Sequence, residues 1–239
     1  MKQCAVVPMT SSADLDAATA PVSGEAPLVR VVRSVLKAVA EGDVVVATVP
    51  SLAASVEECL RAAGLGIAVA VTRGSGSRRQ VLRVGLEHLG VEPHTAASVL
   101  ICDHRFPLSP GELAVRVLAA LATGGDVVVP VLPVTDSVKT VDELGSVLGT
   151  VDRATLRTVQ FPRGFTASAL WQLVTGPLWV PEVRGSEAPA TASESLDEFH
   201  DALCAGLDVG VVDGDAVAFQ VELPRDVHLL DAVIACRCD

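Results

Sequence analysis

Short apolar runs rich in valine and alanine alternate along the chain with segments of helical periodicity. Such runs occupy residues 4–7, 43–49, 67–72, 98–102 and 127–131. Strands that are apolar on both faces and are separated by helices are typical of a parallel sheet covered on both sides. The pattern therefore predicts an α/β fold, with a doubly wound, mostly parallel central sheet, in one domain that spans residues 1–239.

The segments between the strands contain helix signals. A helix should begin at Pro27, because apolar residues follow it every three or four positions, and Gly42 should end it. Ser51 is the expected N-cap of a helix over residues 52–63. The other expected segments are polar loops at 9–26 and 176–189, helices from residue 80 through 89, at 109–122, 166–174, 193–206 and from Pro224 onward, and strands at 209–212 and 217–223.

Residues 126–165 form the most distinctive stretch of the sequence. After the apolar strand come the polar residues Thr135-Asp136-Ser137-Val138-Lys139, and then two alternating segments about the turn Asp142-Glu143-Leu144-Gly145. Alternation on both sides of such a turn predicts a β-hairpin. We expect a β-arm of about residues 137–160 that stands off the sheet and forms a dimer contact, a site, or both.

The charge balance narrows the classes of partner. The formal net charge is −11, and the chain contains only three lysines, Lys2, Lys37 and Lys139. Neither a nucleic acid nor an anionic membrane is an expected partner of such a chain. No apolar run approaches the roughly 20 residues of a membrane span, and the N-terminus lacks the apolar region of a signal peptide. With six scattered cysteines, these features predict a protein of the reduced cytoplasm.

The candidate chemistry lies in three loops, at residues 9–26, 73–79 and 103–108. Each loop follows the carboxyl end of a predicted strand, which is the edge where parallel sheets bind ligands. Asp103 is either a Mg²⁺ ligand or a cap of the following turn. Gly74 and Gly76 either cradle a phosphate with backbone N–H groups or form a flexible turn, and Arg78 beside them is either a ligand contact or a solvated side chain.

A series of short motifs points to a known family. It begins with Cys-Ala-Val-Val-Pro at residues 4–8 and Gly-Leu at 85–86, and it ends with Val-Val-Asp-Gly-Asp at 211–215 and Ala-Phe-Gln at 218–220. Its densest part is Pro-Val-Thr-Asp-Ser-Val-Lys at 133–139, Thr-Val-Asp-Arg at 150–153 and Gln-Phe-Pro-Arg-Gly-Phe at 160–165. In this order the motifs resemble the IspD family, the 2-C-methyl-D-erythritol 4-phosphate cytidylyltransferases, over nearly the whole chain.

The resemblance implies a three-layer, Rossmann-like nucleotidyltransferase fold and a homodimer formed through the β-arm. The implied reaction transfers CMP from CTP to 2-C-methyl-D-erythritol 4-phosphate or a related polyol phosphate, with Mg²⁺, and releases diphosphate. By the same resemblance, Asp103 holds the metal, Arg78 matches a family arginine, and Asp136, Ser137 and Arg153 bind the substrate across the dimer. The alternative for Arg153 is an ion pair with Asp152 or another acid, and the alternative for Asp136 is a salt bridge within the arm.

Other family features are absent from the sequence. The family's first loop is glycine-rich and basic, whereas residues 9–26 contain one glycine, Gly24, no Lys or Arg, and the acids Asp14, Asp16 and Glu25. At an effective dielectric of about 20, two unit charges roughly 4 Å apart interact by about 4 kcal/mol, so this change of sign opposes triphosphate binding.

Further replacements affect both halves of the expected site. Gln220 replaces a family Lys, and Arg163 replaces a family Gln. Val81 replaces a Ser, and Phe161 replaces a Thr. After Asp103, Arg105 and Phe106 stand where the family has Ala and Arg. Two functions therefore stay open. The first is a cytidylyltransferase of weak or lost activity, and the second is a non-catalytic dimeric paralogue with a binding, regulatory or assembly role.

Overall fold

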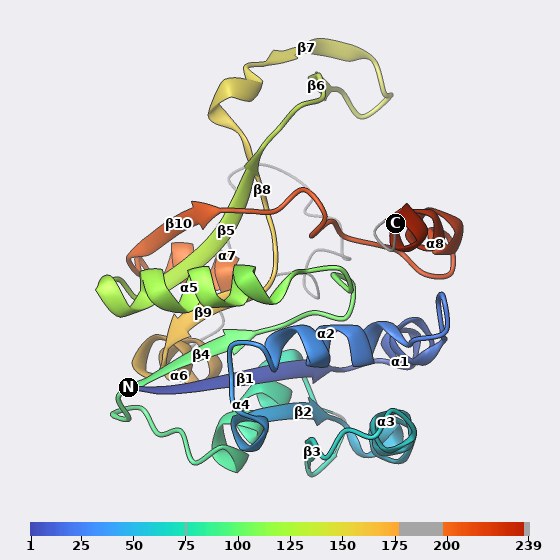
Figure 1. Ribbon diagram of the computed structural model, residues 1–239. Helices are drawn as coiled ribbons and strands as arrows, with labels where there is room; N and C mark the ends of the chain where they lie inside the picture. Colours follow the sequence, from blue (N-terminus) through green and yellow to red (C-terminus); the bar gives the residue numbers. More distant parts are fainter. Residues whose placement is uncertain (75, 177–197, 237–239) are drawn as a thin grey trace.

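The structure is a computed structural model that describes residues 1–74, 76–176 and 198–236, so the loop predicted at 176–189 lies, apart from its first residue, outside the described residues. In chain order (Figure 1), its strands and helices are β1 (Lys2–Met9), α1 (Ser12–Thr19), α2 (Pro27–Val35), β2 (Val44–Thr48), α3 (Pro50–Ala62), β3 (Ala68–Val71), α4 (Arg78–His88), β4 (Ala97–Ile101), α5 (Gly111–Thr123), β5 (Val127–Pro133), β6 (Val138–Val141), β7 (Val147–Val151), β8 (Arg157–Val159), β9 (Arg163–Thr166), α6 (Ala167–Thr175), α7 (Glu198–Cys204), β10 (Val209–Asp213) and α8 (Val227–Cys236).

Within the described residues, the main sheet has eight strands, seven of them in the order β10-β5-β9-β4-β1-β2-β3, with β8 paired to β5. Strand β1 is central and parallel to both of its neighbours, so that Ala5 lies opposite Val44 of β2 and Leu100 of β4. Strands β10 and β5 are also parallel. The predicted doubly wound, mostly parallel sheet is confirmed, and the loops that follow β1, β3 and β4 meet at its carboxyl edge.

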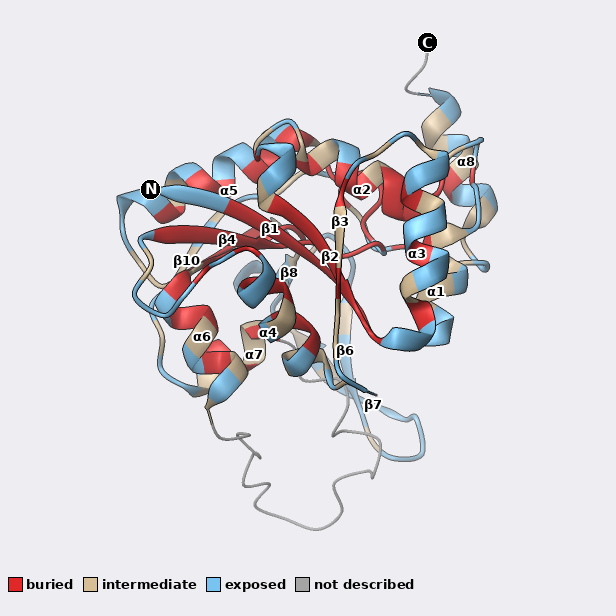
Figure 2. Ribbon diagram, turned by 90° about the horizontal axis from the view of Figure 1, so that it is seen from below, coloured by how far each residue is buried: buried red, intermediate tan, exposed pale blue. Residues whose placement is uncertain are grey.

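Helices cover both faces of this sheet. Helices α2 and α5 lie on one face, and α4, α6 and α7 lie on the other, with the buried strands between them (Figure 2). Residues Val6, Val46 and Leu100 of the central strands are fully buried. Helix α4 approaches β1 closely at Gly85, where an added Cβ would lie 2.9 Å from Val6 Cγ1, so the predicted Gly-Leu pair has a packing role here.

Strand β9 was not predicted, because its sequence was interpreted as a motif and not as a strand. It runs antiparallel between β4 and β5, with Phe165 opposite both Val99 and Val127. Phe165 is fully buried, and Gly164 lets Val117 of α5 pack against the strand, since a Cβ there would lie 2.6 Å from Val117 Cγ1. The strand is short, so its place in the sheet depends on partners that are distant in sequence.

Several local predictions were wrong. Residues 12–19 form α1 where a loop was expected, because the side chains of Ser11 and Asp14 cap the first turn reciprocally. Helix α3 begins at Pro50 with Val49 as its N-cap, so Ser51 lies inside the helix. Helix α2 ends at Val35, before Gly42.

The C-terminal part differs from its prediction as well. Residues 217–223 form no strand, because this segment runs past the sheet and is held by hydrogen bonds to Gln160 and to the carbonyl of Arg105. Pro224 lies in the turn that precedes α8, and the helix itself begins at Val227. A small apolar cluster that includes Val22, Leu108, Val221 and Leu230 packs α8 against the body of the protein.

The predicted β-hairpin is confirmed. Strands β6 and β7 pair antiparallel, Val138 lies opposite Val151, and the hairpin projects from the end of β5 away from the helices (Figure 1). Four large apolar side chains are exposed on it, at Val141, Leu144, Val147 and Leu148. A search of the described residues for a helix long and apolar enough to span a bilayer finds none.

Candidate active site

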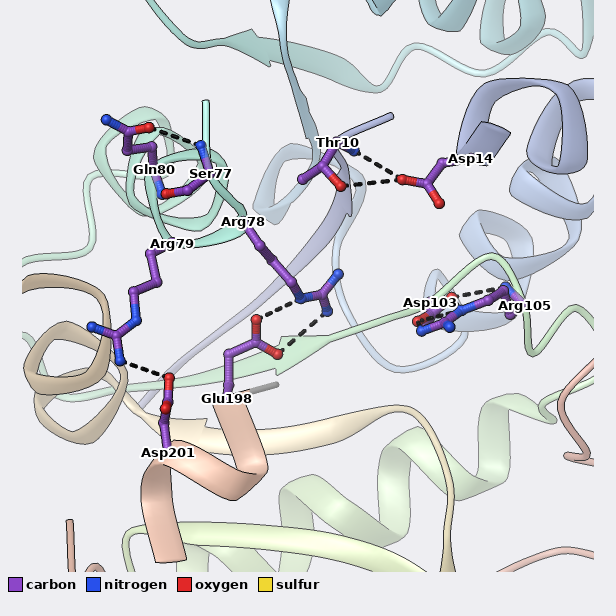
Figure 3. Close-up of polar contacts among 10 residues, drawn as sticks. All are labelled: Thr10, Asp14, Ser77, Arg78, Arg79, Gln80, Asp103, Arg105, Glu198 and Asp201. Carbon is purple, nitrogen blue, oxygen red and sulfur yellow. Dashed lines mark hydrogen bonds and ion pairs between the residues drawn. The ribbon is translucent and has the colours of Figure 1, made fainter. Parts of the chain in front are cut away.

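The turn after β1 is closed by a carboxylate of the same chain. The backbone N–H and the hydroxyl of Thr10 both donate to Asp14 Oδ2 at 3.2 Å (Figure 3). The backbone N–H of Ser11 donates to the same oxygen at 3.0 Å. Burial acts to raise the pKa of Asp14, but His104 and the hydrogen bonds from Ser11 and Thr10 lower it below its ordinary value. The donors that an anion would use after the first strand are therefore already bonded to an ionised side chain.

Asp103 lies at the end of β4, at the neighbouring position along the same edge. Its side chain is 3% exposed, and it accepts from the Arg105 backbone N–H at 2.9 Å, from Arg105 Nε at 3.0 and 3.2 Å, and from Nη2 at 2.6 Å. Burial acts to raise the pKa of Asp103, but the hydrogen bonds and charge of Arg105 lower it to about 2. The backbone contact is the turn cap that the sequence offered as the alternative to a metal ligand.

His104 follows Asp103 in the sequence and interacts electrostatically with both Asp103 and Asp14. It is 5% exposed, and its Nδ1 lies 3.7 Å from Asp103 Oδ1. Burial lowers the pKa of His104 below its ordinary value, although the charges of Asp103 and Asp14 act to raise it.

The start of α4 has its charges paired too. Arg78 Nε and Nη2 donate to the two oxygens of Glu198 at 2.6 and 3.3 Å, and Arg79 donates to Asp201 at 2.7 Å (Figure 3). Both acids come from α7, and both are at least nine-tenths buried. Their spacing of three residues placed them on one helix face, but no sequence signal identified α4 as the neighbour of that face.

The glycines of the predicted phosphate cradle stand on either side of Ser75, which is outside the described residues. The Thr72 hydroxyl donates to the Gly74 carbonyl at 2.7 Å, and a Cβ at Gly76 would lie 3.0 Å from Thr72 Cγ2. Val81, where the family has a serine, is fully buried and presents no polar group.

Three predicted substrate residues lie at the base of the arm. The Arg153 guanidinium donates to the carbonyl of Thr135, the residue that precedes Asp136 and Ser137 in the sequence. All three side chains belong to exposed residues. Within the described residues, Arg153 forms no ion pair with Asp152, whose carboxylate instead caps the turn at Ala154.

Gln160 is a buried organising residue that the sequence analysis missed. Its Nε2 donates to the carbonyls of Asp215 and Ala218 at 2.8 and 2.7 Å, and its Oε1 accepts from the Asp215 N–H at 2.9 Å. These bonds fix the segment that carries Gln220, whose side chain is exposed at the position of the family lysine. A buried amide with three partners is typical of a structural clamp.

The described residues do not fit a Mg²⁺ ion. This cation is usually bound through one or two carboxylates together with water and substrate phosphates, so it needs a carboxylate oxygen that is free of other partners. Both Asp103 oxygens are engaged by Arg105, and Asp14 Oδ2 already accepts three hydrogen bonds. The carboxyl edge of the sheet is thus a surface of internally paired charges, whereas the arm base leaves polar groups exposed.

Comparison with known proteins agrees with this geometry at the level of the fold. The sequence profile of the family IspD, 2-C-methyl-D-erythritol 4-phosphate cytidylyltransferase, matches residues 11–235. The protein of that name from Nocardia farcinica is 34% identical over 217 residues, which are 91% of this chain and 85% of that protein. The one from Corynebacterium glutamicum is 31% identical over 213 residues, or 86% and 80%.

Solved structures give the same answer. The 2-C-methyl-D-erythritol 4-phosphate cytidylyltransferase of Thermus thermophilus has a TM-score of 0.71 and 25% identity, covering 98% of this chain and 100% of that one. A 4-diphosphocytidyl-2C-methyl-D-erythritol synthase, at 19% identity, has a TM-score of 0.76 over 98% of this chain and 100% of that one and so supports the fold. The three-layer nucleotidyltransferase fold is confirmed, and the chain belongs to the IspD family of cytidylyltransferases.

Proposed function

We propose that this chain is an IspD-like cytidylyltransferase whose transfer of CMP from CTP to 2-C-methyl-D-erythritol 4-phosphate, or to a related polyol phosphate, is weak or lost. The proposal treats residues 1–239 as one nucleotidyltransferase domain in a cytoplasmic homodimer. One observation carries it, namely that the Asp14 carboxylate occupies the N–H groups after β1. The five described cysteines are free, which supports a reducing compartment.

The physical argument concerns the triphosphate. Cytidylyl transfer concentrates negative charge on the leaving diphosphate, and catalysis depends on cations and N–H groups that are aimed at that charge. Here the first loop contributes the negative charge of Asp14, and Arg78 and Arg79 are committed to Glu198 and Asp201. A nucleotide would have to displace these internal anions, so its binding would lose most of its electrostatic gain.

The chain keeps the residues that are expected to bind the polyol phosphate, which supports its descent from an active cytidylyltransferase. Asp136, Ser137 and Arg153 are exposed residues at the arm base, and Arg153 donates to the carbonyl of Thr135, which precedes Asp136 in the sequence. A guanidinium beside a hydroxyl suits a phosphate monoester. We propose that these residues retain affinity for a polyol phosphate presented by a second subunit, independently of CTP.

We expect diphosphate release from CTP and 2-C-methyl-D-erythritol 4-phosphate to be at least roughly 10³-fold slower than that of the Nocardia farcinica relative assayed in parallel, because electrostatic stabilisation by each lost group is worth about 10²–10³ in rate. Calorimetric titration with CTP and Mg²⁺ should detect no binding in the micromolar range. Turnover comparable to that of the relative, together with tight CTP binding, would show that the proposed loss of activity is wrong.

The alternative function is that of a non-catalytic dimeric paralogue, and the arm favours it. Leu144 is 92% exposed, and Val147 and Leu148 are 65% and 69% exposed. Exposed apolar groups gathered on one hairpin are typical of a subunit contact. We propose that this apolar tip packs against a second copy, and that the dimer is what the chain retains for a binding, regulatory or assembly role.

A double substitution of Leu144 and Leu148 by Asp should convert the dimer to monomer, because it places two charges on the apolar tip of the arm. Sedimentation velocity measures the change in mass, and circular dichroism checks that the fold is kept. The matched control is Val211→Asp on β10. Val211 is 64% exposed, close to the 69% of Leu148, and its substitution should leave the dimer intact. An unchanged mass for the arm variant would place the subunit contact elsewhere.

A further inference from the structure

The strand end at Asp103 contains its own cation. Arg105 lies only two residues further along, and its side chain folds back so that Nε and Nη2 face the two carboxylate oxygens at 2.6–3.2 Å. The backbone N–H of Arg105 adds a third donor at 2.9 Å. Figure 3 shows the guanidinium lying against the carboxylate in this arrangement. The pair is local in sequence, since its two members are only two residues apart.

The pair is also strong for physical reasons. A bidentate guanidinium and carboxylate form two parallel charge-assisted hydrogen bonds, which are about twice as strong as neutral ones. The Asp103 side chain is 3% exposed, so separating it from Arg105 would leave a buried charge without compensation. A divalent cation would have to displace a partner that is covalently attached and already in place.

The surroundings offer a metal ion little else. The cavity beside Asp103, of about 20 Å³, lies against Val31 and Val35 of α2 and Ala114 of α5, and no carboxylate other than Asp103 lines it. His104 Nδ1 lies 3.7 Å from Asp103 Oδ1, and Mg²⁺ prefers oxygen ligands to the nitrogen of an imidazole.

We propose that Arg105 replaces the divalent cation at this strand end, so that Asp103 binds no metal and any anion that enters the cleft does so without Mg²⁺. The inference concerns metal binding alone and does not depend on whether CMP transfer is retained. Arg105 is thus a specificity residue: it excludes metal-bound nucleotides from the end of β4, at a position where the resemblance to the family implies an alanine.

The test is a titration of the full-length protein with Mn²⁺, followed by the electron paramagnetic resonance signal of free Mn²⁺. The wild-type protein should show no site with a dissociation constant below about 1 mM. Arg105→Ala should gain one site per chain, with affinity raised at least roughly tenfold, and Asp103→Asn in the same background should remove it. Arg105→Gln keeps the polar side chain without its charge and serves if the alanine variant does not fold.

The control is Arg83→Ala, which removes an exposed arginine from α4 and should leave Mn²⁺ binding at the wild-type level. A wild-type site that Asp103→Asn abolishes would overturn the proposal, as would Arg105 variants that fold but gain no site. Activity is measured separately. CMP transfer by the wild-type protein would contradict the proposed loss of function without changing the outcome of the Mn²⁺ titration.

Discussion

Replacing Asp14 by Asn should raise the affinity of this protein for CTP and for inorganic diphosphate by roughly 10- to 100-fold. The reason is that the Asp14 carboxylate now accepts the N–H groups of Thr10 and Ser11 and repels any second anion. An unscreened pair of charges would be worth about 4 kcal/mol at an effective dielectric of 20, and solvent at this partly exposed side chain reduces the gain to about 1.4–2.8 kcal/mol. Isothermal titration with each ligand measures the change.

Asparagine is the informative substitution because its side-chain carbonyl can still accept the N-cap hydrogen bond, so α1 is retained and only the charge is removed. Asp16→Asn is the matched control. It removes the same charge from the same helix, at an exposed residue outside the hydrogen bonds of the first turn, and should change the affinity only slightly. Equal effects of the two substitutions would mean that net charge, and not the position of Asp14, opposes the ligand.

Phe165→Ala should destabilise the protein by about 3–5 kcal/mol. The Phe165 ring is fully buried on β9, which pairs with β4 and β5, so its removal leaves a cavity between the sheet and the helices that cover it. Chemical denaturation followed by circular dichroism gives the free energy of unfolding from the midpoint and the slope. Because β9 directly precedes α6, we also expect the loss to appear in the protection of α6 amides from hydrogen exchange.

Val115→Ala provides the reference for this measurement. Val115 is half exposed on α5, and alanine is the better helix former, so the free energy of unfolding should change by less than about 0.5 kcal/mol. If Phe165→Ala cost as little as this control, β9 would not be a core strand of the sheet and the strand order described above would be wrong at its centre.

Most of the fold could be predicted, because most strands are apolar runs that are followed by polar loops. Residues 127–131 read as a buried strand and are the start of β5, and the turn at residues 142–145 produced the hairpin. The failures have specific causes. Strand β9 is too short for its pattern to be separated from a loop, and α1 depends on the capping pair of Ser11 and Asp14, which was overlooked in a polar segment.

Single residues of the site could be predicted from the sequence, but their interaction partners could not. Asp103 and Arg78 were placed at the correct edge of the sheet, since parallel strands put the following residues there. The partners Arg105 and Glu198 were not identified. The pair of Asp103 and Arg105 spans two residues and depends on a tight turn, whereas Glu198 reaches Arg78 across 120 positions of sequence through the packing of α7 on α6 and the contact of α6 with α4.

The sequence by itself determined the family, the parallel sheet and the sign of the first loop's charge, because apolar periodicity, motif order and the absence of Lys and Arg from residues 9–26 are properties of the chain. Only the tertiary structure shows which groups these charged side chains contact. Asp14 turns back to the N–H groups after β1, and Asp103 is held by Arg105. Those two contacts are short-range, whereas the pairing of Arg78 with Glu198 depends on the packing of α7 near α4, which no linear pattern contains.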